Sequence, residues 1–177
     1  MRFVDFLKTT VLACAGAATL LGVLAFRSVA LDDDQALLAF ALSWWSVAAL
    51  VGLVLGRERS TLPPIARLLA GARSSTSLPE QSSPGRMLAN RLWPLFVMLL
   101  LSAGLGWLWP QVPAIATGFL TIWALYWRRQ EAAVTAIEER DGVAFFLEPT
   151  KPWQPIQLIR TPGFRRVSPP SLNGAGS

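Results

Sequence analysis

The sequence contains no histidine and only one cysteine, Cys14. An intrachain disulfide is therefore excluded, and a Cys/His zinc, haem or iron–sulfur site lacks its usual ligands. Charged residues are scarce as well: they make up 15% of the chain, whereas a soluble domain of this size carries about 25%. The charges occur in blocks separated by long uncharged stretches, which is typical of a chain partly surrounded by lipid.

Familiar catalytic motifs are also lacking, since the chain has no G-x-S-x-G, H-E-x-x-H or phosphate-binding loop. We therefore expect neither an enzyme nor a bound cofactor. The net charge of +5 could indicate a nucleic-acid partner. The basic residues, however, flank apolar stretches, as they do on the cytoplasmic side of membrane proteins, so no nucleic acid is expected.

Four apolar stretches are each close to the ~20 residues that cross a bilayer. Soluble helices carry a polar face, and none of the four stretches has one. The sequence predicts an all-α integral membrane protein with four transmembrane helices, arranged as two antiparallel hairpins within residues 1–127. The expected spans are residues 9–26, 36–56, 92–109 and 112–127. None contains an ionisable residue, so proton relays and carboxylate-coupled transport lack their usual machinery.

The basic residues predict the orientation of the spans. With a cytoplasmic N-terminus, fifteen of the sixteen basic residues are cytoplasmic and only Arg27 is outside. Both termini are then cytoplasmic. Arginine greatly outnumbers lysine, and alanine, leucine and glycine are plentiful, which favours a GC-rich bacterial genome. We expect the bacterial cytoplasmic (inner) membrane, or an internal membrane derived from it.

The first 30 residues also resemble a signal peptide, because Ser28-Val29-Ala30 offers small residues where a signal peptidase would cut. The apolar stretch is longer than the 7–15 residues typical of a signal peptide, which favours a retained helix. Cleavage would leave three spans and would not change their orientation.

Residues 57–91 are expected to form a cytoplasmic loop between spans two and three. Pro63-Pro64 can open a short interfacial helix, and Arg67 and Arg73 would meet lipid headgroups or a partner. The rest of this loop, rich in Ser, Pro and Gly, is predicted to be flexible.

Residues 128–166 are expected to form a cytoplasmic appendage. The fourth helix should continue to about Arg140, with Gly142 just past its end. A small β-hairpin of residues 143–148 and 156–161 follows, and Arg160, Arg165 and Arg166 are expected to contact a partner or headgroups. A lone hairpin is marginal in water, so it should pack against the loop, the membrane or a partner. Residues 167–177 are predicted to be a disordered tail.

Trp44 and Trp45 are predicted to fall near the middle of the bilayer, and Trp123 near the inner end of span four. They could stack on a flat lipid-soluble ligand. The simpler interpretation, which we favour, is helix packing with Ser43 or Ser46 accepting an indole N–H.

The acidic run Asp32, Asp33 and Asp34 could hold a divalent cation. Three adjacent side chains converge poorly on one ion, so a solvated turn that caps the second span is the preferred interpretation. Glu138 and Glu139 are adjacent and would point about 100° apart on a helix, which excludes a facing acid/base pair. We expect them to be a solvated helix terminus.

Small residues recur four positions apart and predict close helix–helix faces, more often within the protein than towards another one. These residues are Ala18 and Gly22; Ala48, Gly52 and Gly56; Ser102 and Gly106; and Ala114 and Gly118.

The functional hypothesis is a non-catalytic accessory, scaffold or assembly factor. Its partners would be the lipid bilayer and another membrane or membrane-associated protein. The alternative is a small transporter or carrier of a flat lipid-soluble ligand that uses the midplane tryptophans. A membrane enzyme has the least support.

Overall fold

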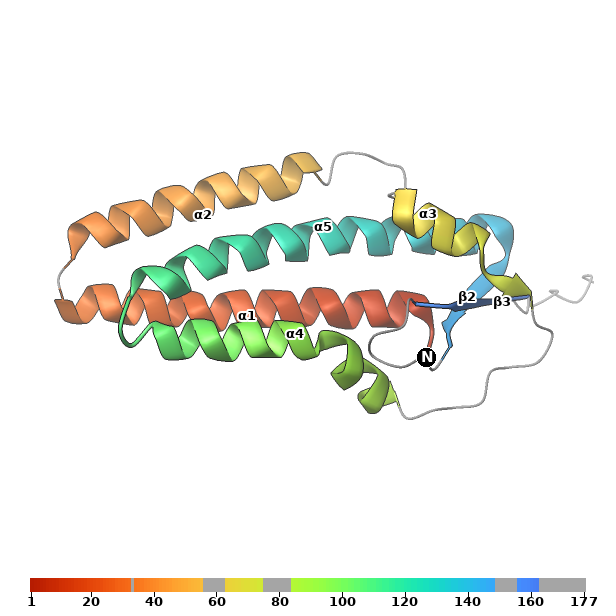
Figure 1. Ribbon diagram of the computed structural model, residues 1–177. Helices are drawn as coiled ribbons and strands as arrows, with labels where there is room; N and C mark the ends of the chain where they lie inside the picture. Colours follow the sequence, from red (N-terminus) through yellow and green to blue (C-terminus); the bar gives the residue numbers. More distant parts are fainter. Residues whose placement is uncertain (33, 56–62, 75–83, 149–155, 163–177) are drawn as a thin grey trace, which may run out of the picture.

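The computed structural model describes residues 1–32, 34–55, 63–74, 84–148 and 156–162, and four long antiparallel helices dominate it (Figure 1). The helices are α1 (Phe3–Asp32), α2 (Gln35–Leu55), α4 (Pro84–Leu105) and α5 (Gln111–Asp141). Figure 1 shows α5 between α1 and α2, with α4 along the other side of α1. The α1–α2 and α4–α5 connections lie at one end of the bundle, which we call the turn end.

Helices α1 and α5 lie antiparallel along almost their whole length. Arg2, at the start of α1, bonds to Glu138 near the end of α5, and Lys8 lies 3.9 Å from Glu131. Further along α1, a Cβ added to Gly22 would lie 3.6 Å from Cγ2 of Thr117. The two helices are thus the continuous centre of the molecule.

Three helices are long and apolar enough to cross a membrane: Phe3–Leu31, Gln35–Leu55 and Gly85–Leu105. Their outward residues are exposed and apolar, as with Leu50 and Leu100, which are 62% and 72% exposed. These helices indicate a membrane location.

The prediction of four apolar spans is wrong in number, because α5 does not belong to this set. Helix α5 exists and begins where predicted. Its uncharged part, however, runs only from Gln111 to Trp127 and includes Thr117 and Thr121. The charged residues that follow make α5 as a whole the least apolar of the four long helices.

Several helix ends differ from the predicted spans. Helix α1 continues outwards past both Lys8 and Arg27, since nothing in the flanking sequence breaks a helix. Helix α4 begins at Pro84 rather than at residue 92 and ends at Leu105 rather than at residue 109.

Because α4 begins at Pro84, Pro94 lies inside the helix and not in its first turn. Proline has no N–H to donate and its ring crowds the preceding turn, so helices bend where it occurs. Figure 1 shows this bend in the first half of α4, which turns the start of the helix away from the bundle.

The opposite end of the bundle carries a three-stranded sheet in the order β1-β3-β2. Strands β2 (Val143–Leu147) and β3 (Leu158–Pro162) are antiparallel and confirm the predicted hairpin. Gly142 precedes β2 in the left-handed conformation (φ 60°), so its predicted place just past the helix end is also confirmed.

Two chain segments flank the hairpin. Strand β1 (Arg73–Ser74) pairs in parallel with β3. On the other side, Arg2 forms a bridge with Phe146, and the amide of Leu147 donates to the carbonyl of Met1 at 3.0 Å. The hairpin is therefore not alone, which meets the expectation that it needs packing partners.

A hydrophobic core lies beneath the sheet. The predicted short helix α3 (Pro63–Ala70) packs against this core and contributes the buried Ile65 to it. We call this unit, made of residues 1–8, 63–74, 128–148 and 156–162, the folded end. Its core residues come from α1, α3, α5, β2 and β3, and they are Phe3, Val4, Phe6, Leu7, Ile65, Val134, Phe145, Leu147 and Leu158.

Residues 1–30 supply buried side chains to both ends of the bundle, including Leu7 and Leu21, which have no exposed surface. Cleavage after Ala30 would remove them and leave α5 without its main neighbour. We therefore expect the mature protein to retain these residues. Intact mass spectrometry of protein purified from membranes checks this, and a mass that begins at Leu31 would contradict it.

Candidate functional site

Trp44 and Trp45 on α2 face α5. The indole N–H of Trp44 donates to the carbonyl of Ile115 at 3.0 Å, and that of Trp45 donates to the carbonyl of Ala114 at 2.8 Å. The packing interpretation is thus supported, but the expected acceptors Ser43 and Ser46 are wrong. Backbone carbonyls of the neighbouring helix take that role, because α2 and α5 approach closely there.

Small residues permit this approach. A Cβ added to Gly118 would overlap the indole of Trp44, so only glycine leaves room for that ring. A Cβ on Gly52 would lie 2.8 Å from Cδ1 of Leu125 on α5. Ala48, in the same ridge of α2, is fully buried.

The other small residues also contribute to internal contacts. Ala114 is fully buried, and Ala18 and Ser102 are nearly so. A Cβ on Gly106, just after α4, would overlap the ring of Pro113 in the first turn of α5. The structure thus places these small residues on faces within the protein. Gly56 lies outside the described residues.

Hydroxyl groups in the helices are likewise used internally. Thr10, Thr117 and Thr121 each donate to the carbonyl four residues earlier, with O–O distances of 2.8 to 2.9 Å. Among the described residues, every buried side-chain nitrogen or oxygen has a hydrogen-bond partner. These hydrogen bonds satisfy polar atoms in surroundings where lipid offers no hydrogen-bond partner.

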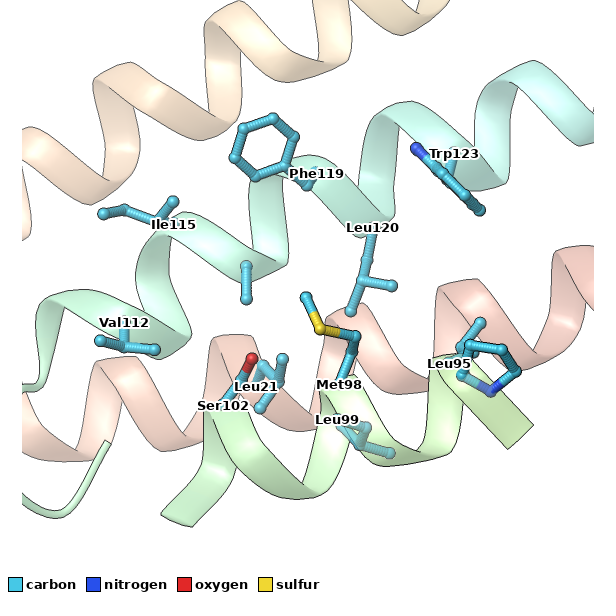
Figure 2. Close-up of a pocket in the computed structure, with 12 residues that line it drawn as sticks. Leu21, Leu95, Met98, Leu99, Ser102, Val112, Ile115, Phe119, Leu120 and Trp123 are labelled. Carbon is cyan, nitrogen blue, oxygen red and sulfur yellow. The ribbon is translucent and has the colours of Figure 1, made fainter. Parts of the chain in front are cut away.

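Trp123 lies apart from the other two tryptophans, on the side of α5 that faces α4. There it lines an apolar groove of about 570 Å³ between α4 and α5, with α1 behind it (Figure 2). Figure 2 shows Met98 and Leu120 pointing towards each other across the groove. The sequence did not predict this groove, because its walls come from three helices and no single stretch reveals how these helices are rotated against one another. Its lining residues are Leu21, Pro94, Leu95, Met98, Leu99, Ser102, Val112, Ile115, Ala116, Phe119, Leu120 and Trp123.

The acidic turn is only partly described. Oδ1 of Asp34 accepts a hydrogen bond from the amide of Leu37 at 3.0 Å, so Asp34 caps α2 as predicted. The side chain of Asp32 and all of Asp33 lie outside the described residues. Within the described part of the chain, no three His, Cys, Asp or Glu side chains are grouped to hold a metal ion.

Glu138 is the clearest correction at the level of side chains. It is only 5% exposed, and it accepts a hydrogen bond from Nη2 of Arg2 at 2.6 Å and another from the amide of Phe145 at 2.9 Å. The prediction of a solvated helix terminus is wrong for Glu138 and fits only the exposed Glu139. The N-terminus folds back over α5, which buries one carboxylate and leaves its neighbour in water.

The predicted contact arginines lie on the folded end. Arg67 on α3, Arg73 on β1 and Arg160 on β3 are all exposed. Because Arg73 pairs with Ile159 and Ser74 with Arg160, these two arginines alternate onto opposite faces of the sheet. Arg165 and Arg166 lie outside the described residues.

One ion pair marks the junction between α5 and the sheet. Nε of Arg140 donates to Oδ1 of Asp141 at 2.8 Å, and this hydrogen bond lowers the pKa of the Asp141 carboxyl, with the charge of Arg160 acting in the same direction. Both residues of the pair are solvated, so salt screens their interaction.

No protein-family model, curated protein or solved structure matches this chain. The function is therefore inferred from the geometry of the described residues. That geometry offers an apolar groove along the bundle and a folded end with exposed arginines. Both are suited to binding other molecules by contact.

Proposed function

We propose that this protein is a non-catalytic accessory, scaffold or assembly factor of the bacterial cytoplasmic membrane. The proposal depends on the way the folded end is attached to the helix bundle. Because α1 and α5 run from the bundle directly into it, the sheet is held rigidly against the membrane domain. A rigid, solvent-facing unit on a membrane bundle suits recognition of a partner protein.

The proposed topology places the folded end and both termini in the cytoplasm and lets α5 cross the bilayer beside the three apolar helices. Three observations support it. Helix α5 follows α1 in antiparallel register from Thr117 to Glu138, so it traverses the same depth. Neighbouring helices also flank its less apolar surface, since Ala114, Thr117 and Gly118 are buried. Basic residues concentrate at the folded end, as the positive-inside rule requires.

The alternative, a carrier of a flat ligand, has less support. The indole N–H groups of Trp44 and Trp45 are engaged with α5, and Trp123 lies on a different face. The three tryptophans do not surround a common space among the described residues.

Reversing the charge at Arg73 and Arg160 tests the recognition role. Because the two arginines lie on opposite faces of the sheet, the R73E/R160E variant reverses charge on both faces at once. We expect this variant to stay in the membrane and to retain at least about ten-fold less of a stoichiometric partner, because like charges across an interface cost several kcal/mol. The measurement is quantitative mass spectrometry of complexes purified in mild detergent. The partner is identified first, as the protein that co-purifies with the wild-type chain in a constant molar ratio.

The matched control is R128E/R129E, which reverses two exposed arginines of α5 that lie outside the sheet. This control should keep the partner. Equal loss in both variants would mean that the sheet has no special role, and recovery of the wild-type chain with no stoichiometric protein would overturn the scaffold proposal.

A further inference from the structure

The groove between α4 and α5 is far too apolar for a soluble metabolite. Ser102 is its one hydroxyl, set among leucine, methionine, proline, phenylalanine and other apolar side chains. Its volume of about 570 Å³ lies within the range of about 300 to 1,000 Å³ typical of ligand sites. The rim is open to the surroundings of the helices, since Met98, Phe119 and Trp123 are 63%, 54% and 58% exposed. An occupant therefore enters sideways from the lipid phase.

The length of the groove suits an extended acyl chain. On α5 the groove extends from Val112 to Trp123, which at 1.5 Å per residue is about 16 Å. An extended hydrocarbon chain is narrow enough to lie along this length between α4 and α5. The length also matches about half of a ~30 Å hydrocarbon core, the depth of one leaflet.

Charge is placed at one end of the groove. Arg91 lies one helical turn before Leu95 on α4, at the spacing that puts it on the lining face, towards the folded end. Its side chain is half-buried, so it is partly shielded from the surroundings of the helices. The bend at Pro94 separates the first turns of α4 from α5 at this point.

We infer that the groove binds an anionic phospholipid, with one acyl chain along Leu95, Leu99 and Leu120 and the phosphate at Arg91. In the groove, the acyl chain exchanges its weak contacts with bulk lipid for contacts with three helices. The guanidinium of Arg91 pairs with the phosphate. The lipid thereby fills the gap between α4 and α5 and braces the bent helix against the bundle.

Native mass spectrometry of the full chain in neutral detergent, with phosphatidylglycerol or phosphatidylcholine added, tests this inference. We expect one phosphatidylglycerol retained per chain, and less phosphatidylcholine. A116L, which fills the groove, should lower the retention of both lipids. R91Q should lower the preference for phosphatidylglycerol about five-fold, the contribution of one arginine near an anionic surface, and R91K should restore most of it.

Matched controls separate the groove from other sites. A39L adds the same bulk to the exposed face of α2, and R129Q removes an exposed arginine of α5; both should behave as the wild type. Thermal unfolding of each variant verifies that it is folded.

Three outcomes would overturn the inference. A folded A116L variant could retain lipid like the wild type, which would place the lipid elsewhere. R129Q could match R91Q, which would mean that general surface charge selects the lipid. Finally, R27Q at the turn end could abolish the preference while R91Q left it intact, which would place the headgroup at the opposite end.

Discussion

Replacing Gly118 with alanine is expected to destabilise the bundle by about 2–4 kcal/mol. The added methyl group would overlap the Trp44 indole, and forced overpacking costs about 1–3 kcal/mol. Moving the ring also lengthens its hydrogen bond to the Ile115 carbonyl, which is worth about 1 kcal/mol. Thermal unfolding in detergent, followed by tryptophan fluorescence, measures the effect, and G118A should unfold at a clearly lower temperature.

Alanine substitutions at two further glycines serve as comparisons for G118A. A Cβ on Gly104 meets no heavy atom within 4 Å, so G104A should be neutral or stabilising by up to about 1 kcal/mol, because alanine favours a helix. G52A should fall between them, since its closest contact is the flexible end of Leu125. If G118A and G104A unfolded at the same temperature, the close contact between α2 and α5 would be refuted.

Replacing Glu138 with alanine is expected to cost about 2–4 kcal/mol and to loosen the sheet. The buried amide of Phe145 would lose its acceptor, which costs about 1–3 kcal/mol, and Arg2 would lose its ion-pair partner. Arg2 is 51% exposed, so water compensates part of that second loss. Hydrogen exchange at the Phe145 and Leu147 amides, together with thermal unfolding, measures the effect.

The neighbouring residue provides the control. E139A removes the same side chain from the adjacent, exposed position and should change stability by less than about 0.5 kcal/mol. R2M should reproduce only part of the E138A effect, because Glu138 would still accept from Phe145. Equal exchange rates at Phe145 in E138A and E139A would contradict the proposed role of this carboxylate.

The elements that depend on local sequence were predictable. The apolar stretch before residue 57 placed α2 within one residue at each end, and Gly142 marked the end of α5 because a left-handed residue is needed there. The hairpin followed from two β-like runs separated by prolines. The acidic run was predicted to cap α2 because a carboxylate just before a helix can accept a hydrogen bond from an amide of the first turn, and Asp34 accepts one from Leu37.

The features that were missed depend on contacts between distant segments. The burial of Glu138 depends on Arg2, and no local pattern connects the two. The indole acceptors on α5 and the groove lined by Leu21, Met98 and Trp123 depend on how the helices are rotated against one another. The count of apolar spans failed for a different reason: the fourth stretch was judged by its lack of charge, although its threonines, glutamine and tryptophans lower its hydropathy.

The contact between Met1 and Leu147 has a consequence for biosynthesis. The ribosome makes the first residues of the chain early, but the strand that receives them follows all four long helices. The core under the sheet therefore cannot close until α5 has been synthesised and has packed along α1. Until then, Phe3, Phe6 and Leu7 have no partners from β2 and β3 and form an exposed apolar surface. Closure of the folded end thus reports that α5 has been made and has packed along α1, and chains that stall earlier leave these apolar side chains without their partners.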